Sequence, residues 1–142
     1  MATTRAARLW QRLVRRRPAA LQLDRTDLEV VASSFDDTES CSAALARATG
    51  LSAQAPAVLR HHLRIPAPHV ESVCAIAAQE GYARAPAGAA SGDALEPVVL
   101  QRVQQLDALH CAQERARMAG LAQRHDGHAE GWDALQPKRT PM

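Results

Sequence analysis

Hydrophobic and polar residues alternate most regularly over residues 58–65. One set of alternate positions is mostly apolar and comprises Leu59, His61, Leu63 and Ile65. The other set is basic and comprises Arg60, His62 and Arg64. Because successive side chains of a strand point to opposite faces, the pattern predicts a half-buried strand with one apolar face and one basic face. The basic set is a candidate binding face.

A helix is expected before this strand, over about residues 38–49. Asp36 and Asp37 offer an N-terminal cap, and Glu39 stands at the position of a capping-box partner. Alanine-rich helix formers follow, and Gly50 is a natural stop. The paired carboxylates are therefore interpreted as capping groups and not as an acid–base pair.

The rest of the chain predicts two further helices and three further strands. One helix runs from Pro68 to Gly81, and the longest covers about residues 107–125 with Asp107 as its cap. The strands are expected at 82–85, 97–104 and 128–135.

From residue 58 onward the expected order is strand–helix–strand–strand–helix–strand. Such a βαββαβ order normally folds into a ferredoxin-like sandwich, a four-stranded antiparallel sheet with both helices on one face. We expect a single α+β domain of this class over residues 38–136, with an extra N-terminal helix. The flanking parts are an arm at 1–17, a connecting segment at 18–37 and a tail at 137–142.

The arm at 1–17 is strongly basic and amphipathic. It has no acidic residue, whereas residues 18–142 carry a formal net charge of −4. Its apolar residues follow helical spacing as far as Pro18. The arm is compatible with docking on a partner, with RNA or an anionic membrane surface, with an organelle transit peptide, or with a terminus that has no role. Its basic residues are Arg5, Arg8, Arg12, Arg15, Arg16 and Arg17.

Composition excludes several classes of protein. Aromatic residues make up 3% of the 142 residues, which argues against a base-stacking platform for nucleic acid. No apolar run reaches the ~20 residues of a membrane-spanning helix. The three cysteines are widely spaced and give neither a disulfide framework nor a metal-binding doublet. We expect a cytoplasmic protein without a cofactor.

A short motif near the C-terminus resembles the end of the RraB-like family, the protein regulators of ribonuclease E (regulator of ribonuclease activity B). That family ends its last helix with Gly, a spacer, Tyr, Asp, Gly and Trp. Here Gly127, Gly131 and Trp132 match, Glu130 replaces the Asp, and Ala129 replaces the Tyr. The order of elements upstream is also similar, so that the resemblance covers about residues 40–135.

The resemblance implies a ferredoxin-like fold, no enzymatic activity, and regulation by binding a large ribonuclease. It brings no catalytic residue to this chain. Physically, Gly127 is expected to take a left-handed cap after the helix, and Gly131 indicates a bulge or a close backbone approach. Trp132 is expected to anchor a small core, with an exposed binding hot spot as the alternative.

Catalytic and metal-binding arrangements find little support in the sequence. His61 and His62 are adjacent in a strand, point to opposite faces and cannot chelate one ion together. His125 and His128 form one close pair of possible ligands, but zinc sites need a second pair. We therefore predict no metal site and no catalytic residue.

Two classes of function remain open. The first is a non-catalytic regulator that binds a ribonuclease E-type enzyme or another component of RNA decay, with possible RNA or anionic membrane contact through the arm. The second is a small ligand-binding or enzymatic α+β domain of unknown substrate, or an adaptor that acts at a membrane surface or on RNA through the arm. A convergent polar cluster would favour a ligand-binding domain, whereas an exposed face with Arg60, His62 and Arg64 would favour the regulator.

Overall fold

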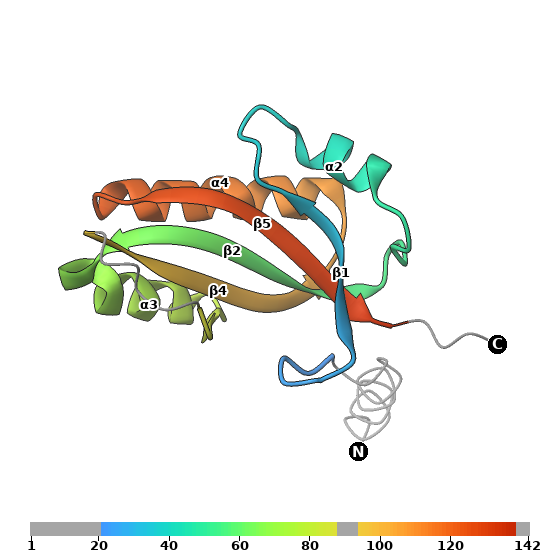
Figure 1. Ribbon diagram of the computed structural model, residues 1–142, viewed down its shortest axis with the longest axis horizontal. Helices are drawn as coiled ribbons and strands as arrows, with labels where there is room; N and C mark the ends of the chain where they lie inside the picture. The colour runs from blue at the N-terminus through green and yellow to red at the C-terminus, as the bar shows by residue number, and fades with distance from the viewer. Residues whose placement is uncertain (1–20, 88–93, 139–142) are drawn as a thin grey trace, which may run out of the picture.

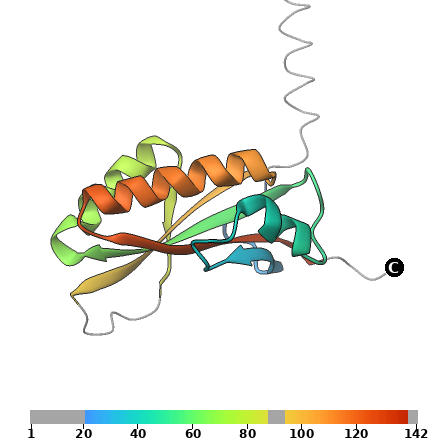
Figure 2. The ribbon, with the colours of Figure 1, turned by 90° about the horizontal axis from the view of Figure 1, so that it is seen from above.

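The computed structural model describes residues 21–87 and 94–138, which form an α+β fold. In this part of the chain five strands make one antiparallel sheet, and three α-helices pack on one of its faces (Figures 1 and 2). The strands are β1 (Leu28–Ser34), β2 (Pro56–Pro66), β3 (Ala83–Ala85), β4 (Leu95–Gln105) and β5 (His128–Pro137). The helices are α2 (Cys41–Arg47), α3 (Val70–Gln79) and α4 (Ala108–Arg124), with a 3-10 turn at Ala67–His69.

The sheet order is β1-β5-β2-β4-β3, so the strand at 58–65 lies in the middle of the sheet, as β2. The strands expected at 82–85, 97–104 and 128–135 are present as β3, β4 and β5. Long antiparallel ladders join β2 to both β4 and β5. The alternation of β2 places one of its faces in the core, and this specifies the register of the pairing.

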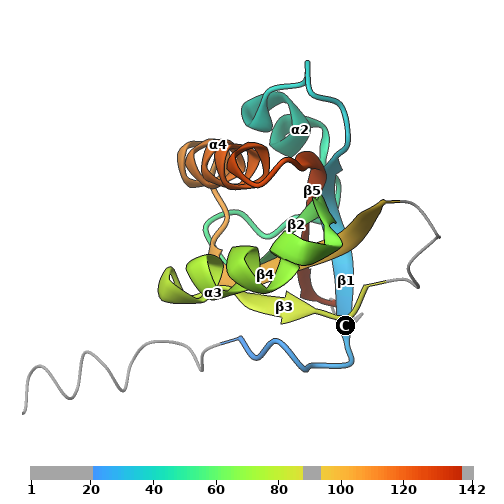
Figure 3. The same ribbon diagram turned by 90° about the vertical axis from the view of Figure 1, so that its left-hand side faces the viewer.

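The expected number of four strands is wrong, because β1 adds a fifth strand beside β5 (Figure 3). Apolar and polar residues do not alternate in this strand, and the register of its pairing explains why. A shift between Val30 and Ala32 interrupts the ladder, and both Val31 and Ala32 are buried. A bulge of this kind breaks the period-2 pattern on which strand prediction rests.

Helix α2 begins later than expected, at Cys41, and Ser40 is its cap. The Ser40 hydroxyl accepts a hydrogen bond from the backbone N–H of Ala43 at 3.1 Å. Asp36 instead accepts from the backbone N–H of Thr38 at 2.9 Å and so closes a local turn. The amphipathic helix expected over the arm lies outside the described residues.

Two clusters of buried side chains fill the space between the sheet and the helices. The first lies beneath α3 and the second half of α4, and includes Leu63, Ile65 and Met118. The second lies beneath α2 and the first half of α4, and Trp132 is its largest member. None of the three described α-helices lies on the opposite face of the sheet (Figures 2 and 3).

Candidate functional site

The three predicted basic residues of β2 lie on the face of the sheet opposite the three described α-helices, and each lies beside a carboxylate of β5. The Arg60 guanidinium binds Asp133 in bidentate fashion, with N–O distances of 2.7 and 2.6 Å. His62 Nε2 lies 3.3 Å from the same carboxylate. Arg64 donates to Glu130 at 2.8 Å. We call this surface, defined by Arg60, His62, Arg64, Glu130 and Asp133, the open face.

The central pair of the open face is fixed electrostatically. Burial by itself opposes ionisation of Asp133, but the hydrogen bonds from Arg60 and the nearby His62 imidazole outweigh it, and the pKa of Asp133 is lowered. The same pair raises the pKa of Arg60. The two arginines are thus neutralised by two carboxylates, and the open face is not the basic surface that the β2 sequence suggests by itself.

Exposed apolar side chains border the open face at β1. Phe35 follows β1 directly and is 57% exposed, and Val30 is 52% exposed. The Phe35 ring lies edge-on to His62, with 5.1 Å between the ring centroids. An aromatic side chain beside fixed charges is typical of protein–protein contacts.

The motif residues have structural roles in this fold. Trp132 is fully buried, as expected of a core anchor. Gly131 permits the expected close approach, since a Cβ there would meet the Phe35 ring and would lie 2.5 Å from the Ser34 carbonyl oxygen. The expectation for Gly127 is wrong, because the left-handed residue after α4 is Asp126, with φ of 60°. Gly127 is needed instead because a Cβ would collide with the carbonyl oxygen of Arg64.

Replacing Gly127 by alanine is therefore expected to destabilise the fold by about 1–3 kcal/mol, the usual cost of overpacking. The matched control is Gly120→Ala within α4, where the added Cβ meets only the end of the flexible Arg124 side chain, at 3.1 Å. Alanine is the better helix former, so the control should be neutral or slightly stabilising. Chemical denaturation measures both, and equal midpoints for the two variants would contradict the steric account.

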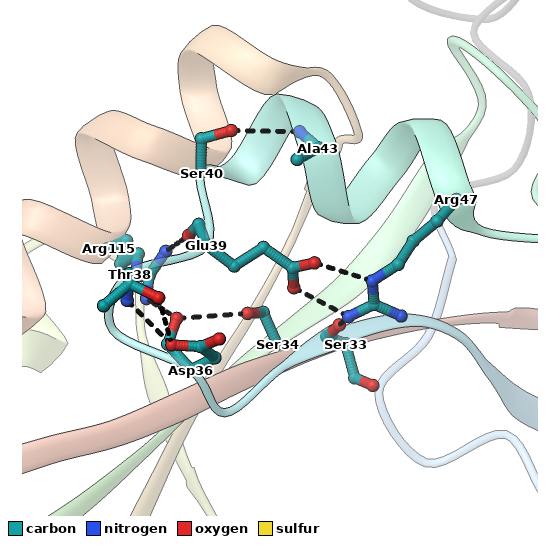
Figure 4. Close-up of polar contacts among 9 residues, drawn as sticks. All are labelled: Ser33, Ser34, Asp36, Thr38, Glu39, Ser40, Ala43, Arg47 and Arg115. Atoms are coloured by element: carbon teal, nitrogen blue, oxygen red, sulfur yellow. Dashed lines mark hydrogen bonds and ion pairs between the residues drawn. The ribbon is translucent and has the colours of Figure 1, made fainter.

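The loop between β1 and α2 is held against α4 by a set of polar contacts (Figure 4). Arg115 of α4 donates to the backbone carbonyl oxygens of Glu39 at 2.6 Å and Asp36 at 2.9 Å. Arg47 of α2 binds the Glu39 carboxylate at 2.8 and 2.7 Å, which lowers the pKa of Glu39 to about 2. The loop between β1 and α2 is therefore held through two backbone carbonyl groups, by Arg115, and through the Glu39 side chain, by Arg47.

A hollow of about 210 Å³ lies between this loop, α4 and β5. Its polar lining comes from elements far apart in the sequence: Asp37 of the loop, His61 of β2, Arg115 and Gln123 of α4, and His128 of β5. Met118, Ala119 and Ala129 supply apolar lining. His61 is only 2% exposed, and its Nε2 has no hydrogen-bond partner among the described residues. We call this cavity the α4 hollow.

A second group of polar side chains, from β4, α4 and the position just before β3, lies next to His61. Arg102 donates to Glu114 at 2.7 Å and its guanidinium lies over the Tyr82 ring, 4.4 Å from the centroid. The Tyr82 ring is edge-on to His61 at 5.8 Å. Burial raises the pKa of Tyr82 and lowers that of His61 to about 4, so both groups are uncharged at neutral pH.

Sequence reasoning did not find the α4 hollow. It placed His61 toward the core, but the alternation of β2 gives no sign of Asp37 or Arg115 beside it. Within residues 21–87 and 94–138, no group of three or more His, Cys, Asp or Glu side chains could hold a metal ion. Among those residues, Cys41, Cys74 and Cys111 are free, and no helix is long and apolar enough to cross a membrane. The arginines of the arm lie outside this part of the chain.

The fold and its surfaces define an α+β protein with one helix-covered sheet face and one open face. No family model, no curated protein and no solved structure matches this chain. The resemblance to the RraB-like family therefore rests on the motif residues and on the order of elements.

Proposed function

We propose that this protein is a non-catalytic regulator that binds a ribonuclease E-type enzyme, or another component of RNA decay, and modulates its activity in the cytoplasm. The observation that carries the proposal is the open face with its fixed ion pairs and its exposed aromatic border. The motif resemblance names the partner class. The antiparallel sheet, in the order β1-β5-β2-β4-β3 and with its helices on one face, supports a ferredoxin-like sandwich extended by β1.

The charges of the open face favour a protein partner over nucleic acid. Arg60 and Arg64 are each neutralised by a carboxylate, so the face offers no excess positive charge to phosphates. Its ion pairs are formed before binding, which reduces the entropy lost when a partner orders these side chains. Phe35 and Val30 add apolar area next to them.

The proposal predicts that Phe35→Ala weakens binding to the host's own ribonuclease E-type enzyme at least about tenfold, because exposed aromatic residues beside a fixed polar surface are typical hot spots. Surface plasmon resonance with purified proteins measures the change. Leu109→Ala is the matched control, since Leu109 is 64% exposed but lies on α4, in the helix layer. Its affinity should equal that of the wild type.

Thermal melting of both variants separates lost binding from lost folding. Equal affinities of the wild type and Phe35→Ala for the enzyme would show that the open face is not the binding surface. If the wild type neither binds nor inhibits the enzyme, the regulator proposal fails as a whole.

The arm at 1–17 is proposed to add electrostatic attraction toward RNA, an acidic partner surface or anionic lipid. Removing it should weaken association and flatten its salt dependence. In duplex-like phosphate contacts the log–log salt slope approaches about −0.9 for each neutralised phosphate. Full binding with an unchanged slope after truncation would exclude the arm and leave the open face as the recognition surface.

A further inference from the structure

We propose that the α4 hollow binds a small zwitterion of the α-amino acid class. The inference goes beyond the regulator function, because the hollow lies on the helix side of the sheet and shares none of the charged residues of the open face.

The hollow is formed before any ligand arrives. Arg115 is tethered to two carbonyl oxygens of the β1–α2 loop, and the loop is tethered again through Glu39 and Arg47. Figure 4 shows these contacts converging on the loop from α4 and α2. A lining with little freedom to lose favours binding of a small molecule, whose own contacts are few.

The polar lining has unused hydrogen-bonding capacity. In the part of the chain that the structure describes, the buried Nε2 of His61 has no hydrogen-bond partner, whereas Asp37 and Gln123 at the rim of the hollow are exposed. Native structures leave few buried polar atoms unpaired, and at the wall of a hollow a bound molecule can supply the partner. His61 is uncharged at neutral pH, since burial lowers its pKa to about 4, so it suits a neutral hydrogen-bonding group of the ligand.

Charge complementarity selects the ligand class. Arg115 and Asp37 are the two formally charged residues of the lining, and neither forms an ion pair with another described side chain. The nearby carboxylate of Glu39 is held by Arg47, and that of Asp36 by Thr38. A simple anion or cation would form an ion pair with only one of the two charges. A ligand with both a carboxylate and an ammonium group satisfies both.

The size and apolar lining limit the ligand further. A volume of about 210 Å³ is below the roughly 300–1,000 Å³ of pockets that hold drug-sized molecules. Met118, Ala119 and Ala129 offer apolar contact to a short side chain. The hollow thus fits a free amino acid.

Titration of the full-length protein with each of the twenty common L-amino acids, followed by amide NMR spectra, tests the proposal. At least one amino acid is expected to shift the signals of Asp37, Ala119 and Gly131 in a saturable manner. Its N-acetyl derivative and its amide, which each lack one charge, should bind at least about fivefold more weakly, as expected for a partly exposed ion pair. Equal binding of either derivative would overturn the zwitterion, and no response to any amino acid would overturn the site.

Two variants locate the site. Ala119→Leu fills the hollow from α4 and should weaken binding at least about tenfold, whereas Ala78→Leu, at an exposed position on α3, should not change it. Asp37→Asn changes only an exposed carboxylate and should weaken binding about threefold to fivefold, so the test holds even if Ala119→Leu fails to fold. Undiminished binding by Asp37→Asn, or by folded Ala119→Leu, would overturn the assignment.

Discussion

Replacing Trp132 by alanine is expected to lower the free energy of unfolding by about 3–5 kcal/mol, the range for a large aromatic side chain removed from a core. Trp132 is the largest fully buried side chain. Apart from Leu59, Leu106 and Val31, the other buried members of its cluster are small: Ala32, Cys41, Ala44, Ala57, Cys111 and Ala134. Short side chains cannot move far enough to fill the space, so most of the cavity should remain. Urea denaturation with tryptophan-independent detection by circular dichroism measures the loss.

Trp132→Phe is the informative companion to the alanine variant. It keeps an aromatic ring, and it removes the indole N–H, which is buried without a partner among the described residues. The cost should therefore be well below that of alanine. An alanine variant that unfolds at the wild-type midpoint would mean that Trp132 is not a core anchor.

Acidification is expected to remove roughly 3 kcal/mol of unfolding free energy through His61 alone as the pH falls from about 6.5 to about 4. Burial lowers the pKa of His61 to about 4, and the nearby charge of Glu114 opposes this only in part. Between pH 6.5 and about pH 4 the unfolded chain binds a proton at this residue and the folded chain does not. Acidification therefore stabilises the unfolded state relative to the folded state. Below about pH 4 both states are protonated and His61 contributes no further loss.

His61→Leu isolates this effect. Urea denaturation across the pH range should give a stability that falls less steeply for the variant than for the wild type between pH 6.5 and 4, with parallel curves above that window. Identical slopes would show that His61 is protonated in the folded protein at the same pH as in the unfolded chain.

The strands and helices after residue 55 were predictable from the sequence because each is a local pattern. The alternation at 58–65 identifies β2 and assigns Arg60, His62 and Arg64 to one face without any knowledge of neighbouring strands. Asp107 caps α4 as expected, accepting from the backbone N–H of His110 at 2.8 Å. The strand β1 was not predictable, because its bulge interrupts the alternation and pairing with β5 supplies the hydrogen bonds that its own pattern does not reveal.

The motif residues divide in the same way. A glycine within a strand indicates a close approach of another backbone, and this was predictable for Gly131. The end of α4 meets β2 in such a way that Gly127 faces the carbonyl of Arg64. The left-handed conformation is therefore taken by Asp126 and not by Gly127. Local conformational preference would favour glycine at position 126 as well as at position 127. Only the packing against β2 shows that position 127 is the one that requires it.

The sequence by itself determined the order of elements after residue 55, the inward placement of His61 and Trp132, and the shared face of the β2 arginines, since all of these depend on periodicity within one segment. Only the tertiary structure decided the charge of the open face and the existence of the α4 hollow. Asp133 lies 73 residues from Arg60, and Arg115 lies 79 residues from Asp36, so no local pattern connects them. The partners of a charged residue depend on which strands and helices become neighbours. The arrangement of neighbours is determined by the burial of apolar surface from all the elements together.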